Sequence, residues 1–465
     1  MPGTQITDLA RMANRALLGL LGRHMVSTLF ALATLVGTLQ AHEPPSVPRM
    51  VFAHYMVCCP VHGLAATIED FAQEIAIARS YGIDGFALNV PGWKQEPHYL
   101  EISRRIFRAA ERSGSSFKLF MSFDGAPVED SATMLAELSQ SPAYLRIDDR
   151  PVVSTYSGSP EWGERLVRRL AAMGLKPFLV PNYQYPSEHF WVHNHGHPTA
   201  EFLDAMYRDH PEVDGYFVFG PDLGYPKPPA DGALVANRSK IAGKISMIGI
   251  MPYYRGLRGN FRVFESGGLQ GMAAQWASAI EAGADWIEIV TWNDWGEATY
   301  VAPYGGSRQQ DLWNYGWGPL LSHEMFLKAS RYYIDWFKSS RPPAIEHPSI
   351  YYFYRPHSKS AYGIASPDTG EQGRPKGSED LVDGIYLSAF LPRPLTVDLI
   401  GGERHQSVSL PAGVCHHRFD LMEGALTIKV SDQGRQIAEK QLEFPVTKLG
   451  QIGNFNYFAG EVPLP

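Results

Sequence analysis

The stretch that decides the fold is residues 286–297, which read WIEIVTWNDWGE. Its first part, Trp286–Thr291, is almost continuously apolar and ends in a polar and aromatic cluster. Such a run is typical of a strand that is buried on both faces of a parallel sheet. Seven earlier runs share this character: Val51–Tyr55, Gly85–Asn89, Lys118–Phe123, Val152–Tyr156, Pro177–Pro181, Gly215–Phe219 and Ser246–Met251.

Amphipathic stretches separate these runs, and the clearest are Ile68–Ser80, Glu101–Glu111, Glu161–Met173 and Leu269–Ala282. Their apolar residues recur with the helical period, as helices that pack on one face require. Eight strand–helix repeats within about 290 residues match the count and size of a (β/α)₈ TIM barrel of the α/β class. A doubly wound open sheet is the alternative, which is disfavoured because no Gly-x-Gly-x-x-Gly follows the first run.

The composition changes after Ser339–Pro343, which reads as a joint between two parts of the chain. Beyond it, turn residues separate five β-type runs, namely Ile350–Tyr354, Asp383–Phe390, Leu395–Ile400, Gly413–Asp420 and Ala425–Val430. We therefore predict a barrel over residues 49–340 and an appended C-terminal antiparallel β-sandwich over residues 345–465. The sandwich is either a scaffold packed on the barrel or a carbohydrate-binding module.

Residues 1–41 have the order of a secretory signal. Arg11, Arg15 and Arg23 precede the apolar run Val26–Leu39, and a cleavage position follows Ala41. Because the run is short for a membrane span, we predict a signal peptide and a secreted or periplasmic protein. An uncleaved membrane anchor is the alternative, and no other contact with a membrane is expected.

Charge and cysteine content narrow the function classes. The net charge is −7 and no basic tract occurs, which argues against nucleic acid as a partner. The 10 Trp and 23 Tyr offer flat faces that suit sugar rings, although such rings also fill barrel cores. The three cysteines, Cys58, Cys59 and Cys415, are expected to be free thiols. A Cys58–Cys59 disulfide and a bridge to Cys415 are the alternatives.

Polar and aromatic residues follow the predicted strands at the end where a barrel of this type places its active site. We predict that twelve of them contact substrate: His54, Tyr55, Asn89, Asp124, Asn182, Tyr183, Asp222, Tyr253, Trp292, Asn293, Trp295 and Tyr300. Tyr156 and Tyr254 occupy equivalent strand ends.

Asp294 and Glu297 follow the eighth strand and are the predicted catalytic pair. Hydrolysis of a glycosidic bond needs one acid to protonate the leaving oxygen and one carboxylate to activate water or attack the sugar. Burial among Trp rings would keep one of the two acids protonated. The alternative is structural, because Asp-x-x-Glu is also the spacing of a helix capping box.

Histidines raise two further alternatives. His54 ends the first strand and is either part of the site or a hydrogen-bonded scaffold residue. His193, His195 and His197 alternate along the chain in a pattern that can bind a metal ion. The favoured interpretation is that this segment forms part of the wall of the substrate cleft. We predict no metal site.

Four blocks in this order resemble glycoside hydrolase family 71, the α-1,3-glucanases or mutanases: Val51–Val57, Gly82–Asn89, Phe117–Asp124 and Glu288–Glu297. The resemblance spans residues 50–340, and Tyr351–Pro356 looks like its continuation. It implies endo-acting hydrolysis of α-1,3-glucan with inversion of configuration and without a cofactor, with Glu297 as general acid and Asp294 as general base. We also predict a monomer. The signal sequence and the lack of cysteine pairs suit a bacterial member.

The chain departs from the family around the sugar-binding positions. Cys58-Cys59-Pro60 follows the first block, Val218–Asp222 replaces a Ser-Trp-Asp type run, and Trp295 and Ala298-Thr299 also differ. These departures leave the reaction type in place and keep two alternatives open. One is a hydrolase of α-mannan or of a bacterial exopolysaccharide, and the other is a non-catalytic barrel that binds glycans.

Overall fold

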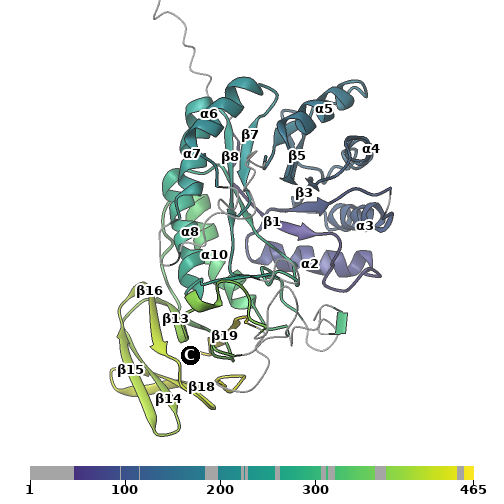
Figure 1. The fold of residues 1–465 in the computed structure, drawn as a ribbon. Coiled ribbons are helices and arrows are strands. Elements are labelled where there is room, and N and C mark those ends of the chain that lie inside the picture. The colour runs from purple at the N-terminus through teal and green to yellow at the C-terminus, as the bar shows by residue number, and fades with distance from the viewer. Residues whose placement is uncertain are drawn as a thin grey trace, which may run out of the picture. The chain divides into compact units, whose positions relative to one another are not determined.

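The eight predicted parallel strands are confirmed in the computed structural model, in which they form one curled sheet with helices on its outer side (Figure 1). They are β1 (Met50–Met56), β2 (Gly85–Val90), β3 (Lys118–Asp124), β5 (Arg150–Ser157), β6 (Phe178–Val180), β7 (Gly215–Val218), β8 (Ile245–Ile250) and β11 (Trp286–Ile289). The structure describes residues 47–465 except 95, 115, 184–196, 221–224, 226–228, 257–261, 305–310, 313–319, 362–372 and 448–454.

The sheet order is β5-β3-β2-β1-β11-β8-β7, with β6 paired to β5 and the two-residue β4 (Arg146–Ile147) antiparallel to β5. Backbone contacts also join β6 to the start of β7. Leu179 and Val213 form a parallel bridge, and the amide of Asp214 donates to the Leu179 carbonyl at 2.8 Å. These contacts bring the two ends of the sheet toward each other, so the sheet curls around an inner face.

Helices follow most strands of the curled sheet. The four predicted helical stretches are confirmed as α2 (Ile68–Ser80), α3 (His98–Arg112), α5 (Pro160–Ala171) and α8 (Leu269–Ala282). A capping box between Thr67 and Asp70 fixes the start of α2. No clear helical pattern marks α4 (Val128–Leu138), α6 (Ala200–Asp209) and α7 (Asp231–Ala242) in the sequence, and α10 (Glu324–Ser339) precedes the C-terminal part. Within the described residues, no helix is apolar and long enough to span a bilayer.

An aromatic layer fills the inner face of the curled sheet near the amino ends of its strands. The ring of Phe52 on β1 lies 5.0 Å from Phe120 on β3 and 5.5 Å from Trp286 on β11. Phe178 on β6 reaches Trp286 at 6.1 Å. Because side chains alternate along a strand, the residues two positions later form the next layer on the same face. That next layer leads toward the carboxyl ends of the strands.

The C-terminal part, coloured yellow-green in Figure 1, contains two antiparallel sheets with the orders β16-β13-β12-β19 and β15-β14-β17-β18. The strands are β12 (Ser349–Tyr354), β13 (Gly384–Leu391), β14 (Leu395–Gly401), β15 (Arg404–Leu410), β16 (Gly413–Asp420), β17 (Thr427–Asp432), β18 (Arg435–Gln441) and β19 (Phe458–Val462). The five predicted runs correspond to β12, β13, β14, β16 and β17. Tyr352, Leu387 and Val397 belong to an apolar cluster that these sheets share and that is separate from the core of the curled sheet.

Three short elements complete the described chain. They are the hairpin strands β9 (Tyr254–Arg255) and β10 (Val263–Phe264) and the 3₁₀ turn η2 (Ser378–Asp380).

The cysteine prediction was wrong for two of the three residues. Cys58 and Cys59 form a disulfide in the turn that follows β1, and Cys415 on β16 is a half-buried free thiol. The pairing depends on the local conformation of the turn, which brings the two sulfur atoms together. Neither composition nor spacing reveals that conformation.

Candidate active site

The turn that follows β11 carries both predicted acids, and we call residues 291–301 the acid turn. Its ends are joined by two backbone hydrogen bonds, from the amide of Thr291 to the carbonyl of Thr299 (3.0 Å) and from the amide of Val301 to the carbonyl of Thr291 (3.1 Å). The hydroxyls of Thr291 and Thr299 lie 3.0 Å apart and add a side-chain contact at the same point. The acid turn is therefore closed at its base by its own residues.

Asp294 is held by the acid turn itself. Its amide donates to Oγ1 of Thr291 at 2.8 Å, and its Oδ1 accepts the amide of Glu297 at 2.8 Å. The second bond is one half of a capping box, as the structural alternative required. However, residues 295–298 form turns and no helix follows, so Asp294 orders a turn instead of capping a helix.

The environments of the two half-buried carboxyl groups differ. Burial and the charge of Asp294 raise the pKa of Glu297 to about 8, although a hydrogen bond from Tyr254 opposes the shift. Burial also raises the pKa of Asp294, but the amides of Glu297 and Gly296 and the charge of His54 stabilise its ionised form. At neutral pH, Glu297 is therefore the group that holds a proton, and Asp294 is the better candidate for the carboxylate.

Residues from three other segments surround Glu297. The hydroxyl of Tyr254 on β9 donates to Oε1 of Glu297 at 3.1 Å. The charge of Asp124 at the end of β3 raises the pKa of Glu297, and the charge of Arg262 lowers it. Burial and the charges of Glu297 and Asp124 raise the pKa of Tyr156 on β5, so its hydroxyl stays protonated. The acid turn, β3, β5 and β9 thus meet around one carboxyl group.

Four predicted polar residues lie at the strand ends that lead to this region. His54 on β1 is fully buried, and Asn89 on β2 is nearly so. Asp124 is half-buried and accepts a hydrogen bond from Ser157 at 2.9 Å. Asn182 follows β6 and donates from Nδ2 to the carbonyl of Tyr156 at 2.7 Å. Asp222 lies outside the described residues.

The rings of the predicted aromatic residues are buried within the protein. Trp292 and Tyr55 both donate to Glu74 on α2, at 2.9 and 3.3 Å. The hydroxyl of Tyr183 lies against Gly163 of α5, where a Cβ atom would come within 1.8 Å of it. We therefore do not include these rings among the proposed substrate contacts.

The remaining predicted rings are also buried. The hydroxyl of Tyr253 donates to the carbonyl of Phe455 at 2.6 Å, in the C-terminal part of the chain. Tyr300 packs on Trp295, with ring centroids 4.7 Å apart, and on His323 at 4.4 Å. These three rings are buried and join elements of the fold.

Asn293 and Trp295 hold the loop that follows β1 against the acid turn. The Asn293 side chain accepts the amide of Met56 at 2.8 Å and donates to the carbonyls of Met56 (2.9 Å) and Cys59 (2.8 Å). Nε1 of Trp295 donates to the same Cys59 carbonyl at 2.9 Å. Both side chains therefore position the acids and do not contact solvent.

Sequence reasoning missed three charged residues near this region. Glu288 lies inside the apolar run of β11 and pairs with His54, with Nδ1 and Oε1 2.6 Å apart. Glu74 is a buried member of an amphipathic helix, and Arg262 belongs to the β9–β10 hairpin. A single acid within a β-type run, as in WIEIV, was the signal that could have pointed to Glu288.

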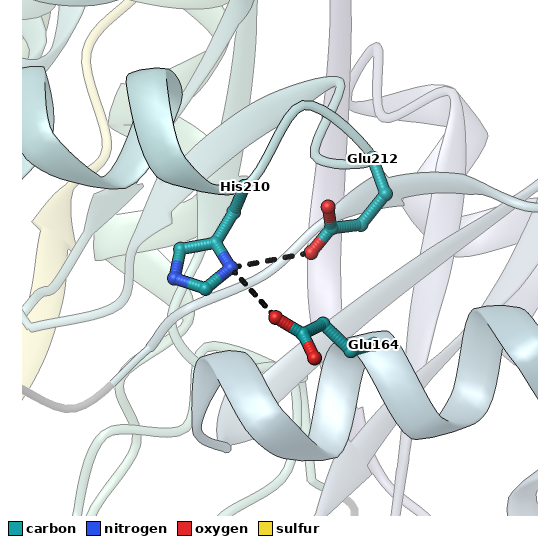
Figure 2. A group of neighbouring side chains, drawn as sticks. All are labelled: Glu164, His210 and Glu212. Atoms are coloured by element: carbon teal, nitrogen blue, oxygen red, sulfur yellow. Dashed lines mark ion pairs between the residues drawn. The ribbon is translucent and has the colours of Figure 1, made fainter.

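One cluster has the composition of a metal site. Nδ1 of His210 lies 3.3 Å from Glu164 and 3.4 Å from Glu212, and Figure 2 shows the three side chains converging from α5 and the α6–β7 connection. All three are partly exposed, and ion pairing between a histidine and two carboxylates accounts for the contact. His197 pairs with Asp231 on α7, whereas His193 and His195 lie outside the described residues.

A curled parallel sheet with two carboxyl groups of unequal acidity at its carboxyl edge is the arrangement of a glycoside hydrolase. The sequence matches the model of glycosyl hydrolase family 71 over residues 47–465. The chain belongs to this family.

Relatives and solved structures resemble the chain along most of its length. A mutanase of Penicillium rubens is 26% identical over 92% of this chain and 94% of its own. The glucan endo-1,3-alpha-glucosidase agn1 of Schizosaccharomyces pombe is 25% identical over 89% of this chain and 94% of its own. A GH99 endo-alpha-mannosidase from Bacteroides thetaiotaomicron aligns with 63% of this chain and 99% of its own, at 13% identity and a TM-score of 0.47.

Proposed function

We propose that this protein hydrolyses α-1,3-glucan internally and with inversion, with Glu297 as the general acid and Asp294 as the general base. The family and the names of the mutanase and glucosidase relatives support the substrate. The unequal protonation of the two carboxyl groups supports the roles. Glu297 would protonate the departing glycosidic oxygen while ionised Asp294 takes a proton from the attacking water.

The observation that carries this assignment is the environment of Glu297. Its carboxyl group is half-buried, accepts the Tyr254 hydroxyl and has a pKa of about 8, so it can donate a proton at neutral pH. Asp294 sits in the same turn but receives two backbone amides, which favour the charged form. Asn89, Asp124 and Asn182 are the proposed substrate contacts that remain from the sequence, and Tyr156 and Tyr254 join them. His54 is fully buried and is not among them.

The proposal extends to the architecture and the location of the protein. We infer that β6 and β7 close the curled sheet into a (β/α)₈ barrel over residues 49–340 and that the two C-terminal sheets form a sandwich over residues 345–465. Residues 1–41 would direct a monomeric enzyme out of the cytoplasm, where insoluble polysaccharide is accessible.

The test is incubation of the purified protein with insoluble α-1,3-glucan, with release of reducing ends as the measurement. Asp294→Asn and Glu297→Gln should each lower the rate at least about a hundredfold, whereas the exposed Glu69→Gln should not. Proton NMR of the first product should show the inverted anomer. Cleavage that survives both substitutions would contradict the site, and cleavage of α-mannan but not α-1,3-glucan would contradict the substrate. Binding without cleavage would identify a glycan-binding protein.

A further inference from the structure

A charged pair lies on the inner face of the curled sheet, one layer beyond the aromatic layer. His54 and Glu288 each come two positions after a ring of that layer, Phe52 on β1 and Trp286 on β11. The strands β1 and β11 are adjacent and parallel, with Phe52 opposite Glu288. Both side chains are fully buried, and Nδ1 of His54 lies 2.6 Å from Oε1 of Glu288. The pair is thus an internal feature of the sheet.

Packing alone does not account for this pair. Removing a carboxylate and an imidazole from water is costly, and apolar residues of similar size would stabilise a core at least as well. The second polar atoms of the pair, Nε2 of His54 and Oε2 of Glu288, have no hydrogen-bond partner among the described residues. Buried groups of this kind call for an explanation beyond stability and often belong to functional sites.

The pair is directly connected to the acid turn. The carbonyl of His54 accepts the amide of Trp292 at 2.7 Å, which fixes the position of the turn relative to β1. The imidazole lies on the inner face of β1, which pairs with β11 directly before the acid turn. From there the charge of His54 lowers the pKa of Asp294. The ring itself is held on two sides, by Glu288 at Nδ1 and by the edge of Phe219 at 4.8 Å.

We infer that His54, anchored by Glu288, is a positioning residue that keeps the carboxyl group of Asp294 ionised. The contact with Glu288 at Nδ1 holds the imidazole in place. Burial raises the pKa of Glu288, whereas the hydrogen bond and charge of His54 lower it. The pair is neutral overall, which limits the cost of burying it. This inference rests on the proposed role of Asp294 as the general base.

The consequence is a defined change in the pH dependence of the enzyme. The titratable groups around Asp294 are His54 on β1, Glu297 in the same turn and Tyr156 on β5. Among these titratable groups only His54 favours the ionised form of Asp294, which the amides of Glu297 and Gly296 also favour. A general base loses activity as the pH falls through its pKa. Loss of His54 should therefore raise that pKa and move the acidic limb of activity to higher pH.

The variants His54→Gln and Glu288→Gln test this inference, and Ser122→Ala is the matched control. Ser122 is also buried on the inner face of the sheet and its hydroxyl has no partner among the described residues, but it is not paired with the acid turn. In His54→Gln we expect the acidic limb of kcat/KM to rise by about one pH unit, with about a tenfold loss below it and little change in KM. Glu288→Gln should give a smaller shift in the same direction, and Ser122→Ala none.

A second measurement separates this inference from the proposed function. In protein labelled with ¹³C at the aspartate carboxyl groups, the signal absent from Asp294→Asn identifies Asp294 without any substrate. Its titration midpoint should rise in His54→Gln even if α-1,3-glucan is not the substrate. An unchanged midpoint in a folded His54→Gln or Glu288→Gln protein, as judged by circular dichroism, would overturn the inference. An inactive wild-type protein would overturn only the proposed function.

Discussion

The hydroxyl of Tyr254 donates a hydrogen bond to Oε1 of Glu297 at 3.1 Å, so β9 and the acid turn meet at one carboxyl group. This bond favours the charged form of Glu297, whereas burial favours the neutral form more strongly. The balance leaves Glu297 with a pKa of about 8.

Replacing Tyr254 by phenylalanine should raise the pKa of Glu297 further. A general acid is active while protonated and loses activity as the pH rises through its pKa. The basic limb of kcat/KM in Tyr254→Phe should therefore move to higher pH, by about one unit or less. Tyr253→Phe is the control, because its hydroxyl binds the carbonyl of Phe455 instead. A limb that moves to lower pH would contradict the role of the Tyr254 bond.

The Asn293 side chain should be important for both stability and activity. Asn293→Ala removes three buried hydrogen bonds to Met56 and Cys59. We expect the free energy of unfolding to fall by about 3 kcal/mol, at roughly 1 kcal/mol for each bond, and kcat to fall because the acid turn loosens. Urea unfolding measures the first effect. Asn237→Ala, at an exposed position of α7, should change neither quantity, and equal stability of the two variants would refute the prediction.

Glu74 should make stability depend on pH. Burial raises its pKa to about 8, above its value in the unfolded chain, so the folded state binds more protons. Its contribution to stability is present at acidic pH and is lost as the pH rises from about 4.5 to about 8. The glutamine in Glu74→Gln cannot ionise, so the variant does not lose this stability. The free energy of unfolding of the variant should therefore increase relative to that of wild type as the pH rises across that range.

Urea titrations of both proteins at pH 5, 6.5 and 8 provide the measurement for Glu74. The exposed Glu69 on the same helix supplies the control variant, Glu69→Gln, for which the difference from wild type should stay constant. A constant difference for Glu74→Gln as well would mean that Glu74 is not protonated in the folded state.

The disulfide predicts a simple labelling pattern. Denatured protein without reductant should take up one iodoacetamide, at Cys415, because Cys58 and Cys59 are joined. After reduction it should take up three. Mass spectrometry of the intact chain distinguishes the two cases, and three additions without reductant would show that the turn after β1 carries free thiols.

Most of the fold could be predicted because buried parallel strands are apolar throughout. Each of the eight strands of the curled sheet corresponds to a nearly continuous apolar run in the sequence. The helices α2 and α8 have the predicted bounds. The strands β15 and β18 could not be found, because they are exposed and mostly polar, as RHQSVSL and RQIAEKQ show. Edge strands of an antiparallel sheet need few apolar residues.

The place of the two candidate acids after the last strand could be predicted, but the burial of the aromatic residues could not. Asp294 and Glu297 stand out because they follow the last strand directly. The neighbours His54 and Tyr55 illustrate why, since His54 faces the inner side of the sheet and Tyr55 faces α2. A shift of one residue reverses the face, and a pattern that is apolar on both faces does not reveal which residue points inward.

Because Thr291 and Thr299 are joined by hydrogen bonds, the conformation of the acid turn is stabilised by contacts within the turn itself. Its attachments to the rest of the protein include His54, the loop after β1, the β9 strand, Glu74 on α2, Leu321 and Asn456. Longer connections elsewhere at this edge could therefore change in length and sequence while the two carboxyl groups keep their relation. A designer who wished to redirect this enzyme to another glycan would graft new connections around residues 291–301 and leave that segment intact.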